Sequence, residues 1–397
     1  MVPFPGRCDG VAGMAARWAD GQTLYGMASE APSPENGVHY IGIDVGKKES
    51  FFFAVDDHGK KLSSGWFPSS GEAAAEIVAK YESLAEGVEV AIEAGNSTFM
   101  LARAMVAAGA DVFVIHPLDN ALIAQSRKKT DKADAKTLAN QRRLGILPEH
   151  SVYVPSEAAE DLRHLITTRE SRVGHRTRLI NQTLAILSRY NILITKRALK
   201  SSVHWKGLRE FLPQLRSADR LVVRQNIKSA VEQNEQIARL EKEMEAMVSK
   251  HFAKETELLR SIPGVGQMTS TALIAWGAPI DRFPSARQFT AYVGLAPSIR
   301  QTGGPTKMGI TGGVRGGGNR HLGGLLTQAA LVFSRTQDSE SELFAWYEEV
   351  KQRRGWKKAR IALARKLAAV AYGVLKHQQA YDPTHVAKAK ASPRQHA

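Results

Sequence analysis

The first third of the chain carries short runs of apolar residues that predict β-strands. Five such runs stand out, at residues 39–45, 50–57, 61–68, 88–94 and 111–116. The first three follow one another closely, which predicts an antiparallel meander with a turn at His58-Gly59-Lys60. Apolar residues at helical spacing separate the later strands.

Helices are predicted at three places in this region. Two lie between strands, at Glu72–Leu84 and Thr98–Ala108, and a short one begins at Pro117. Together with the five strands they give the order βββαβαβα, which is typical of the RNase H-like fold, in which helices cover a mixed sheet. We therefore predict an α/β, RNase H-like domain over residues 38–150.

Long helical patterns replace the strands over residues 151–255. Apolar residues recur there at helical spacing in a charged background, as in Ile237, Leu240, Met244, Met247 and Val248. This pattern predicts an antiparallel helical hairpin or coiled coil. A spacer and a dimerisation arm fit the pattern equally well.

A second compact, mainly α-helical domain is predicted over residues 256–380. It begins near SIPGVGQMTSTALIAWG, contains a Gly-rich stretch from Gly294 to Gly324 and ends in a basic helix. Residues 381–397 are expected to form a flexible tail. Residues 1–37 are rich in Gly, Pro, Ala and Ser without a sustained apolar period, so a disordered and dispensable extension is expected, with Met27 as an alternative start.

The composition predicts a soluble protein with a polyanionic partner. Lys and Arg number 54 against 39 Asp and Glu, which gives a formal charge of +15. Nucleic acid is the leading candidate for the partner. A membrane span is not expected, because no run of about 18 apolar residues is present. Cys8 is the only cysteine, which excludes an intrachain disulfide and fits a cytoplasmic location.

Four acidic residues of the first domain are candidates for a divalent-metal site. Asp44 and Glu93 interrupt apolar strands, where an unpaired charge would be costly. Asp131 and Asp134 stand three apart on one helix face, although Asp131 after Thr130 also fits a helix cap. In an RNase H-like sheet these elements are neighbours. The four acids are therefore expected to hold the hard cations of phosphodiester chemistry.

Basic residues surround the second acidic pair. The run over residues 125–143 contains Arg127, Lys128, Lys129, Lys132, Lys136, Arg142 and Arg143. We predict that it positions phosphates, with Lys128, Lys129 and Lys132 as the candidates. A solvated helix face is the simpler alternative.

The turn Ile262-Pro263-Gly264-Val265-Gly266 resembles the hairpin of a helix-hairpin-helix module. Backbone N–H groups approach a phosphate in such a hairpin, which makes Gly264 and Gly266 candidates for DNA contact. A tight turn between two helices explains the glycines almost as well. The basic charge of the domain favours the DNA contact.

Six motifs occur in a fixed order along the chain. The first half contains IGIDVGK, AIEAGNS and KTDKADAKTLA, and the second half LLRSIPGVGQMTSTALIAWG, FPSARQFTAYVGLAPS and GNRHLGGLLTQAA. Together they resemble the DEDD-type transposases of the insertion sequence 110 family and the related Piv/MooV DNA invertases. The resemblance spans roughly Tyr40 to Lys376, and the shared order makes it specific.

This resemblance implies a RuvC-like domain, a helical linker and a C-terminal transposase domain that supplies a nucleophilic serine. It implies Mg²⁺, or Mn²⁺, on the four carboxylates, and a protein–DNA phosphoester as intermediate. Members of the family are also associated with a structured non-coding RNA that guides target and donor choice. We expect DNA and such an RNA as partners of a homodimer or homotetramer, with Asn319 and Arg320 among the nucleic-acid contacts.

Two positions depart from the family's pattern. The chain reads Thr302-Gly303-Gly304 where a serine typically precedes the glycine pair, and Gly323 where an arginine usually follows Asn-x-x-Leu. Thr302 is therefore the predicted nucleophile, with Ser298 as the second candidate. The alternative is that Thr302 only hydrogen-bonds a turn.

Three other functions fit parts of the sequence. GIDVGKK resembles the first phosphate loop of actin-like and sugar-kinase ATPases, but we find neither the second loop nor the adenosine site of that fold. A metal-dependent junction resolvase would share the fold and the acids and use water as nucleophile. A catalytically inactive nucleic-acid-binding relative is the third. Absence of a covalent protein–DNA adduct would favour the resolvase, and metal-dependent strand cleavage would exclude the inactive relative.

Overall fold

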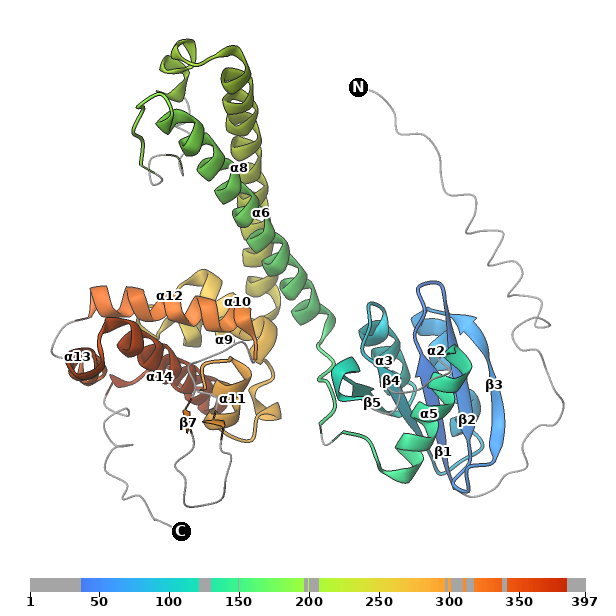
Figure 1. Ribbon diagram of the computed structural model, residues 1–397. Helices are drawn as coiled ribbons and strands as arrows, with labels where there is room; N and C mark the ends of the chain where they lie inside the picture. The colour runs from blue at the N-terminus through green and yellow to red at the C-terminus, as the bar shows by residue number, and fades with distance from the viewer. Residues whose placement is uncertain are drawn as a thin grey trace. The chain divides into compact units, whose positions relative to one another are not determined.

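The protein divides into two compact units between Pro155 and Ser156 (Figure 1). The computed structural model describes residues 37–120, 130–148, 150–195, 199, 207–296, 299–300, 310–311, 318–337 and 341–383. The predicted N-terminal extension, apart from Gly37, and most of the predicted tail lie outside these residues.

The first unit is built on a five-stranded mixed sheet. Its strands are β1 (Val38–Asp44), β2 (Glu49–Val55), β3 (Lys61–Pro68), β4 (Gly87–Glu93) and β5 (Asp111–Ile115). Their order is β3-β2-β1-β4-β5. The first three strands are antiparallel, whereas β4 runs parallel to β1 and to β5. The predicted meander and mixed sheet are confirmed.

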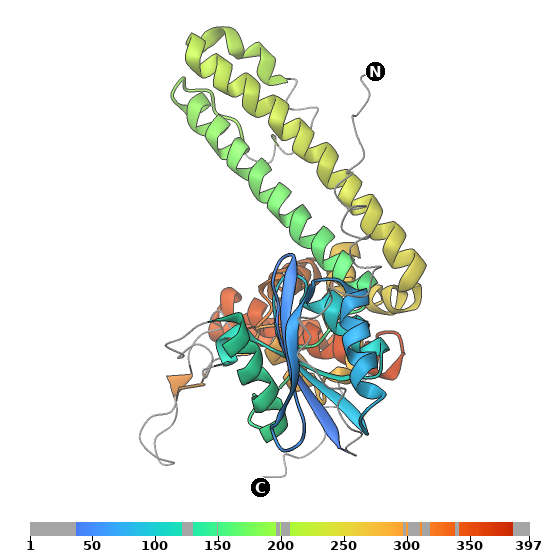
Figure 2. The same cartoon turned by 90° about the vertical axis from the view of Figure 1, so that its right-hand side faces the viewer.

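Helices cover both faces of this sheet. They are α2 (Gly71–Glu82), α3 (Thr98–Ala107), the 3-10 helix η1 (Pro117–Asp119) and α5 (Asp131–Leu144). Helices α2 and α3 lie on one face and α5 on the other (Figure 2). The larger apolar core is on the α2–α3 face, where Ile43 and Val90 meet Leu101. The smaller one joins Ala91 to Leu138 of α5.

Two long antiparallel helices begin the second unit, as the apolar spacing predicts. They are α6 (Glu157–Ser188) and α8 (Ser217–His251). Polar contacts join them along their length: Arg169 pairs with Glu241 at 2.6 Å, and Arg176 Nη1 donates to Asn234 Oδ1 at 2.7 Å. The far end of the pair has its own small core, to which the 3-10 helices η3 (Leu208–Glu210) and η4 (Leu212–Gln214) contribute.

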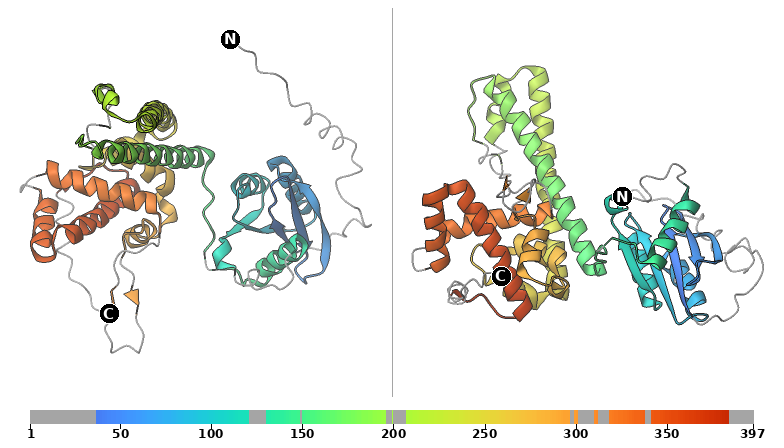
Figure 3. Two further views of the ribbon diagram at one scale, coloured as in Figure 1. Left: turned by 45° about the horizontal axis from the view of Figure 1, so that its top comes forward. Right: turned by 60° about the horizontal axis from the view of Figure 1, so that its bottom comes forward.

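The rest of the second unit is a cluster of helices (Figures 1 and 3). They are α9 (Ala253–Arg260), α10 (Gln267–Gly277), η5 (Ile280–Arg282), α11 (Ala286–Tyr292), α12 (Arg320–Thr336), α13 (Glu342–Arg354) and α14 (Trp356–His377). Two short strands, β6 (Ile299–Arg300) and β7 (Ile310–Thr311), pair between α11 and α12.

The near end of the long helical pair belongs to the same core as this cluster. Leu162 of α6 and Met244 of α8 are buried among residues of α10, α12 and α14. His321 of α12 stacks on Trp276 of α10 with 5.0 Å between ring centroids, and its Nδ1 lies 2.5 Å from Glu170 Oε2 of α6. The pair and the C-terminal helices therefore form one compact unit. No helix in the described part of the chain is long and apolar enough to cross a membrane.

Candidate active site and nucleic-acid interface

Asp44 and Glu93 end two adjacent parallel strands on the same face of the sheet. The register pairs Gly42 with Ala91, so the two acids, each two residues later, lie side by side. Gly42 faces α5, because a Cβ built on it would lie 2.0 Å from the carbonyl oxygen of Ala135. Side chains two residues apart share a face of a strand. Both acids are therefore on the face that α5 covers.

The second pair of acids lies in the first turn of α5. The Thr130 hydroxyl caps this helix by accepting a hydrogen bond from Ala133 N at 3.3 Å. Asp131 is exposed and Asp134 is buried. The first turn of a helix favours negative charge, so part of their role is to stabilise the helix end.

Helix α5 runs opposite to β1 and β4, which directs its first turn toward Asp44 and Glu93. Near its C-terminal end, Arg142 forms ion pairs with Glu89 and Asp111, which lie at the beginnings of β4 and β5. The N-terminal end of α5 therefore points to the ends of these strands. The four predicted acids thus belong to neighbouring ends of three elements on one side of the sheet.

In this structure the four acids do not form a complete set of metal ligands. Among the described residues, no three His, Cys, Asp or Glu side chains are grouped closely enough to hold a metal ion. Asp44, Glu93 and Asp134 each have an interaction partner. Carboxylate oxygens are nevertheless the ligands that Mg²⁺ and Mn²⁺ prefer, so the donor chemistry of the four acids fits a hard divalent cation.

Thr98 fixes the backbone around Glu93, and the sequence did not single it out. Its hydroxyl is fully buried, donates to the carbonyl oxygen of Glu93 at 2.8 Å and accepts from Gly95 N at 2.8 Å. Ala94 N also donates to the carbonyl oxygen of Ile115 at 2.8 Å. The sequence signal was available, because a threonine follows the Glu-Ala-Gly-Asn-Ser run directly.

Comparisons with known proteins identify the family of this chain. A model of DEDD-type transposases matches residues 41–192, and a model of the IS116/IS110/IS902 transposase family matches residues 256–345. The chain belongs to this transposase family. It is therefore a DNA-cleaving and DNA-rejoining enzyme, as the sequence predicted.

Several relatives of this transposase match it over most of its length. The transposase for insertion sequence element IS1111A of Coxiella burnetii is 24% identical over 87% of this chain and 91% of its own length. An uncharacterized 42 kDa protein of insertion element IS900 of Mycobacterium paratuberculosis is 27% identical, over 87% and 97%. A probable family 20 transposase of Pseudomonas aeruginosa is 27% identical, over 74% and 86%.

The basic run near α5 of this transposase divides into two kinds of residue. Arg142 pairs with Glu89 and Asp111, and Arg143 Nη1 donates to the carbonyl oxygen of Asp57 at 3.3 Å. These arginines hold α5 on the sheet, so their contacts are accounted for without a phosphate. Lys132 is exposed and remains a candidate for phosphate binding. Lys128 and Lys129 lie outside the described residues.

The hairpin between α9 and α10 gives its two glycines different roles. Gly264 has a φ of +84°, and a Cβ on it would lie 2.4 Å from the carbonyl oxygen of Ala329. Packing against α12 therefore accounts for Gly264 without DNA. Gly266 is exposed at the start of α10, and a Cβ on it would meet nothing within 4 Å. The predicted DNA contact of the hairpin is better placed at Gly266.

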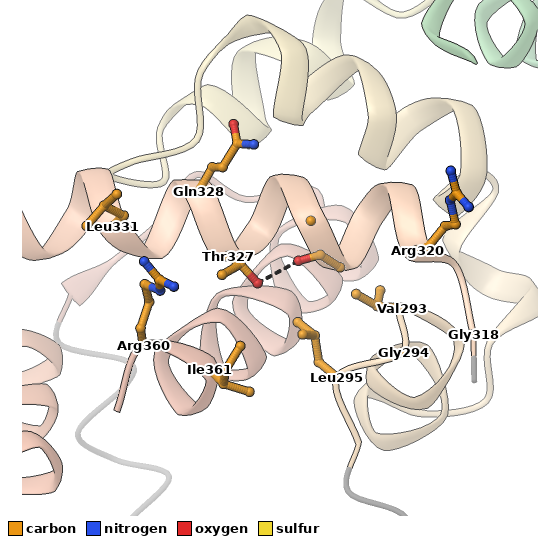
Figure 4. Close-up of a pocket in the computed structure, with 12 residues that line it drawn as sticks. Val293, Gly294, Leu295, Gly318, Arg320, Thr327, Gln328, Leu331, Arg360 and Ile361 are labelled. Carbon is orange, nitrogen blue, oxygen red and sulfur yellow. Dashed lines mark hydrogen bonds between the residues drawn. The ribbon is translucent and has the colours of Figure 1, made fainter. Parts of the chain in front are cut away.

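Asn319 and Arg320 stand at the start of α12. The Asn319 side chain accepts hydrogen bonds from His321 N at 3.0 Å and Leu322 N at 3.1 Å, so it is a helix cap. Arg320 is exposed and lines a pocket of about 460 Å³ (Figure 4). Of the two, Arg320 remains the better candidate for contact with nucleic acid.

The pocket lies between α12, α14 and the segment 293–295 that follows α11. Its walls include apolar side chains and the bare backbone of Gly323 and Gly324 on α12, with Arg320 and Arg360 toward opposite ends of that helix wall (Figure 4). Gly323 packs near the carbonyl oxygen of Val293. A Cβ built on Gly323 would lie only 3.0 Å from that oxygen. Gly323 therefore contributes backbone and no side chain to the pocket wall. Thr302 and Ser298 lie outside the described residues.

Proposed function

We propose that this transposase excises and inserts its element by metal-dependent strand transfer in an RNase H-like site formed by Asp44, Glu93, Asp131 and Asp134. The observation that carries the proposal is the placement of Asp44 and Glu93 on one face, at the ends of adjacent parallel strands. The first turn of α5 lies toward the same ends. Mg²⁺ or Mn²⁺ on these carboxylates would stabilise the charge that develops on the phosphate.

The nucleophile in this proposal is the hydroxyl of Thr302. Its oxygen would bond to phosphorus as the bond between phosphorus and the leaving oxygen breaks, and the leaving strand would take up a proton. The product is a phosphothreonine link to DNA, which the second strand transfer would resolve. Ser298 is the alternative hydroxyl. A structured non-coding RNA that guides target choice, and a homodimer or homotetramer as the active form, complete the proposal.

Strand cleavage with the element's own ends tests the acids. Asp44→Asn and Glu93→Gln should each lower cleavage by at least about 100-fold, because each removes one ligand charge while keeping the side-chain shape. Glu76→Gln is the matched control, because Glu76 is exposed on α2, on the opposite face of the sheet. Cleavage retained in both acid variants would refute the metal site.

Mapping the DNA-linked peptide by mass spectrometry tests the nucleophile. The expected adduct is at Thr302, and Thr302→Val should abolish it while Thr302→Ser retains it. An adduct at Ser298 would reassign the nucleophile. Cleavage without any adduct would identify water as the nucleophile, as in a junction resolvase.

A further inference from the structure

The corner between α13 and α14 presents an exposed tryptophan. Helix α13 ends at Arg354, Gly355 turns the chain with a φ of +78°, and α14 begins at Trp356. Every residue from 351 to 358 is exposed, and Trp356 is 53% exposed. The core of the unit does not require this ring, although the helix that follows is largely buried on one side.

Positive charge surrounds the exposed ring. Lys357 Nζ lies 5.6 Å and the Arg360 guanidinium 5.2 Å from its centroid, within the range of cation–π contacts. No acidic residue occurs between Lys351 and Tyr381. We call the group around this ring the Trp356 platform; it consists of Arg354, Trp356, Lys357, Lys358 and Arg360.

Most charges of the platform are not used in ion pairs. Lys351 and Arg353, just before it, pair with Glu348 at 2.8 Å and Glu349 at 3.7 Å. In contrast, Arg354, Lys357 and Lys358 form no ion pair within the described part of the chain. Positive charges with no ion-pair partner beside a flat aromatic surface are suited to an anionic ligand with a planar group.

Arg360 connects the platform to the pocket of Figure 4. Arg360, whose guanidinium lies over Trp356, is also among the residues that line that pocket, together with Ile361 of α14 and Leu331 of α12. The platform and the pocket therefore share Arg360. Together they offer a stacking surface, cations beside it and an open space with partly apolar walls.

We propose that the Trp356 platform and this pocket bind an unpaired stretch of DNA. One base stacks on Trp356, Lys357 and Arg360 contact the adjoining phosphates, and a neighbouring base enters the pocket. Aromatic rings next to cations are the usual way in which proteins bind single strands, because every base has a face that can stack. The proposal rests on the proposed function in one respect: DNA is taken as the ligand because strand transfer exposes unpaired DNA.

Paired DNA does not suit this surface as well. The faces of the bases in a duplex are covered by their neighbours, so a duplex would use the cations and leave the indole unused. An acidic peptide would also use the cations alone. Dependence on the aromatic ring therefore distinguishes the proposal from simple charge attraction.

Fluorescence anisotropy with a labelled oligothymidylate tests the platform. Full-length Asp44→Asn protein serves as the background, so that cleavage does not interfere. Trp356→Leu should weaken binding by roughly 5-fold to 100-fold, the range of one lost base–aromatic stack, whereas Trp356→Phe should retain most of the affinity. Duplex DNA of the same length should bind almost equally well to all three proteins.

Two further variants test the cations and the pocket. The slope of log affinity against log salt concentration should be shallower by about 0.7 for Lys357→Gln in single-strand binding. Lys228→Gln, on the exposed side of α8, should leave this slope unchanged. Gly324→Leu should fill the pocket and weaken binding. Gly324→Ala is its control, because a Cβ there meets nothing within 4 Å and leaves most of the pocket open.

Stacking itself can be observed with 2-aminopurine in place of one base. Its fluorescence should be quenched by the wild type and recover in Trp356→Leu.

Equal affinity of Trp356→Leu and the wild type for single strands would overturn the proposal. So would a change of oligomeric state in that variant, which would make the ring an interface between copies, or ring-dependent binding confined to RNA. Loss of cleavage in Glu93→Gln with intact single-strand binding would confirm the active site and the platform separately.

Discussion

Gly42 shows how one residue positions the candidate active site. A strand interior normally favours a side chain that packs, and glycine weakens a strand. Here the missing Cβ lets α5 approach to within contact of β1, since Ala135 O and Ala139 N would lie 2.0 and 2.4 Å from a Cβ. This close approach brings the acids of α5 to the side of the sheet that carries Asp44.

Gly42→Ala should therefore destabilise the first unit by about 3 kcal/mol, at the upper end of the range for overpacking, because the clash is with backbone. The matched control is Gly87→Ala on β4, where a Cβ would meet nothing within 4 Å. Urea denaturation of the two variants checks the difference. Equal stability of both would show that α5 can move away from β1 at little cost.

At the scale of elements, the sequence predicted the strands and helices of the first unit because their apolar periods are regular. It also predicted the long helical pair, whose buried Ile237, Met244 and Val248 recur at helical spacing. It could not distinguish residues that hold elements together from residues that bind a ligand. The sequence placed Arg142 in a basic run and Asn319 among candidate nucleic-acid contacts. Only the structure shows that Arg142 forms an ion pair with Glu89 and that Asn319 caps α12.

The tip of the long helical pair contains a contact that depends on pH. Tyr190 donates to Asp219 Oδ2 at 2.6 Å, and Arg189 Nη2 donates to Asp219 Oδ1 at 2.6 Å. The hydrogen bond from Tyr190 is the main cause that lowers the pKa of Asp219, and Arg189 adds to it. Because the pKa of Asp219 is lower in the folded chain than in the unfolded chain, its contacts stabilise the tip at pH values above the unfolded pKa, near 4. This stabilisation is lost as the pH falls through the folded-state pKa of Asp219.

Tyr190→Phe should therefore lower the melting temperature at neutral pH, and the difference from wild type should shrink as the pH falls below about 4. Thermal unfolding at a series of pH values measures this. In an Asp219→Asn background the same tyrosine substitution should have a small effect that does not change with pH. A constant difference between Tyr190→Phe and wild type across the series would contradict the assignment.

At the scale of the whole molecule, α14 supplies both exposed positive charges and buried core residues. The amino-acid composition alone does not separate these two roles. Its basic residues include the exposed Lys357, Lys358, Arg365 and Lys366, whereas Leu363, Leu367 and Leu375 on the same helix are buried in the core. Truncation before this helix would therefore unfold the second unit. Charge substitutions on its exposed side are the informative change, because they leave the core intact.

The two units have separate cores, which predicts that they unfold separately. The first is built around the sheet with α2 and α3, and the second around α10, α12 and α14 with the base of α6 and α8. Fragments 37–155 and 156–397 should each unfold cooperatively in calorimetry, at temperatures close to two transitions of the full chain.

The same fragments should divide the functions. Fragment 156–397 contains the Trp356 platform and should keep the single-strand affinity of the full chain within about 3-fold, since electrostatic and stacking contacts of this unit are complete without the other. Fragment 37–155 should bind single strands weakly and cleave nothing by itself. A single transition of the full chain, well above those of both fragments, would show instead that the units stabilise each other.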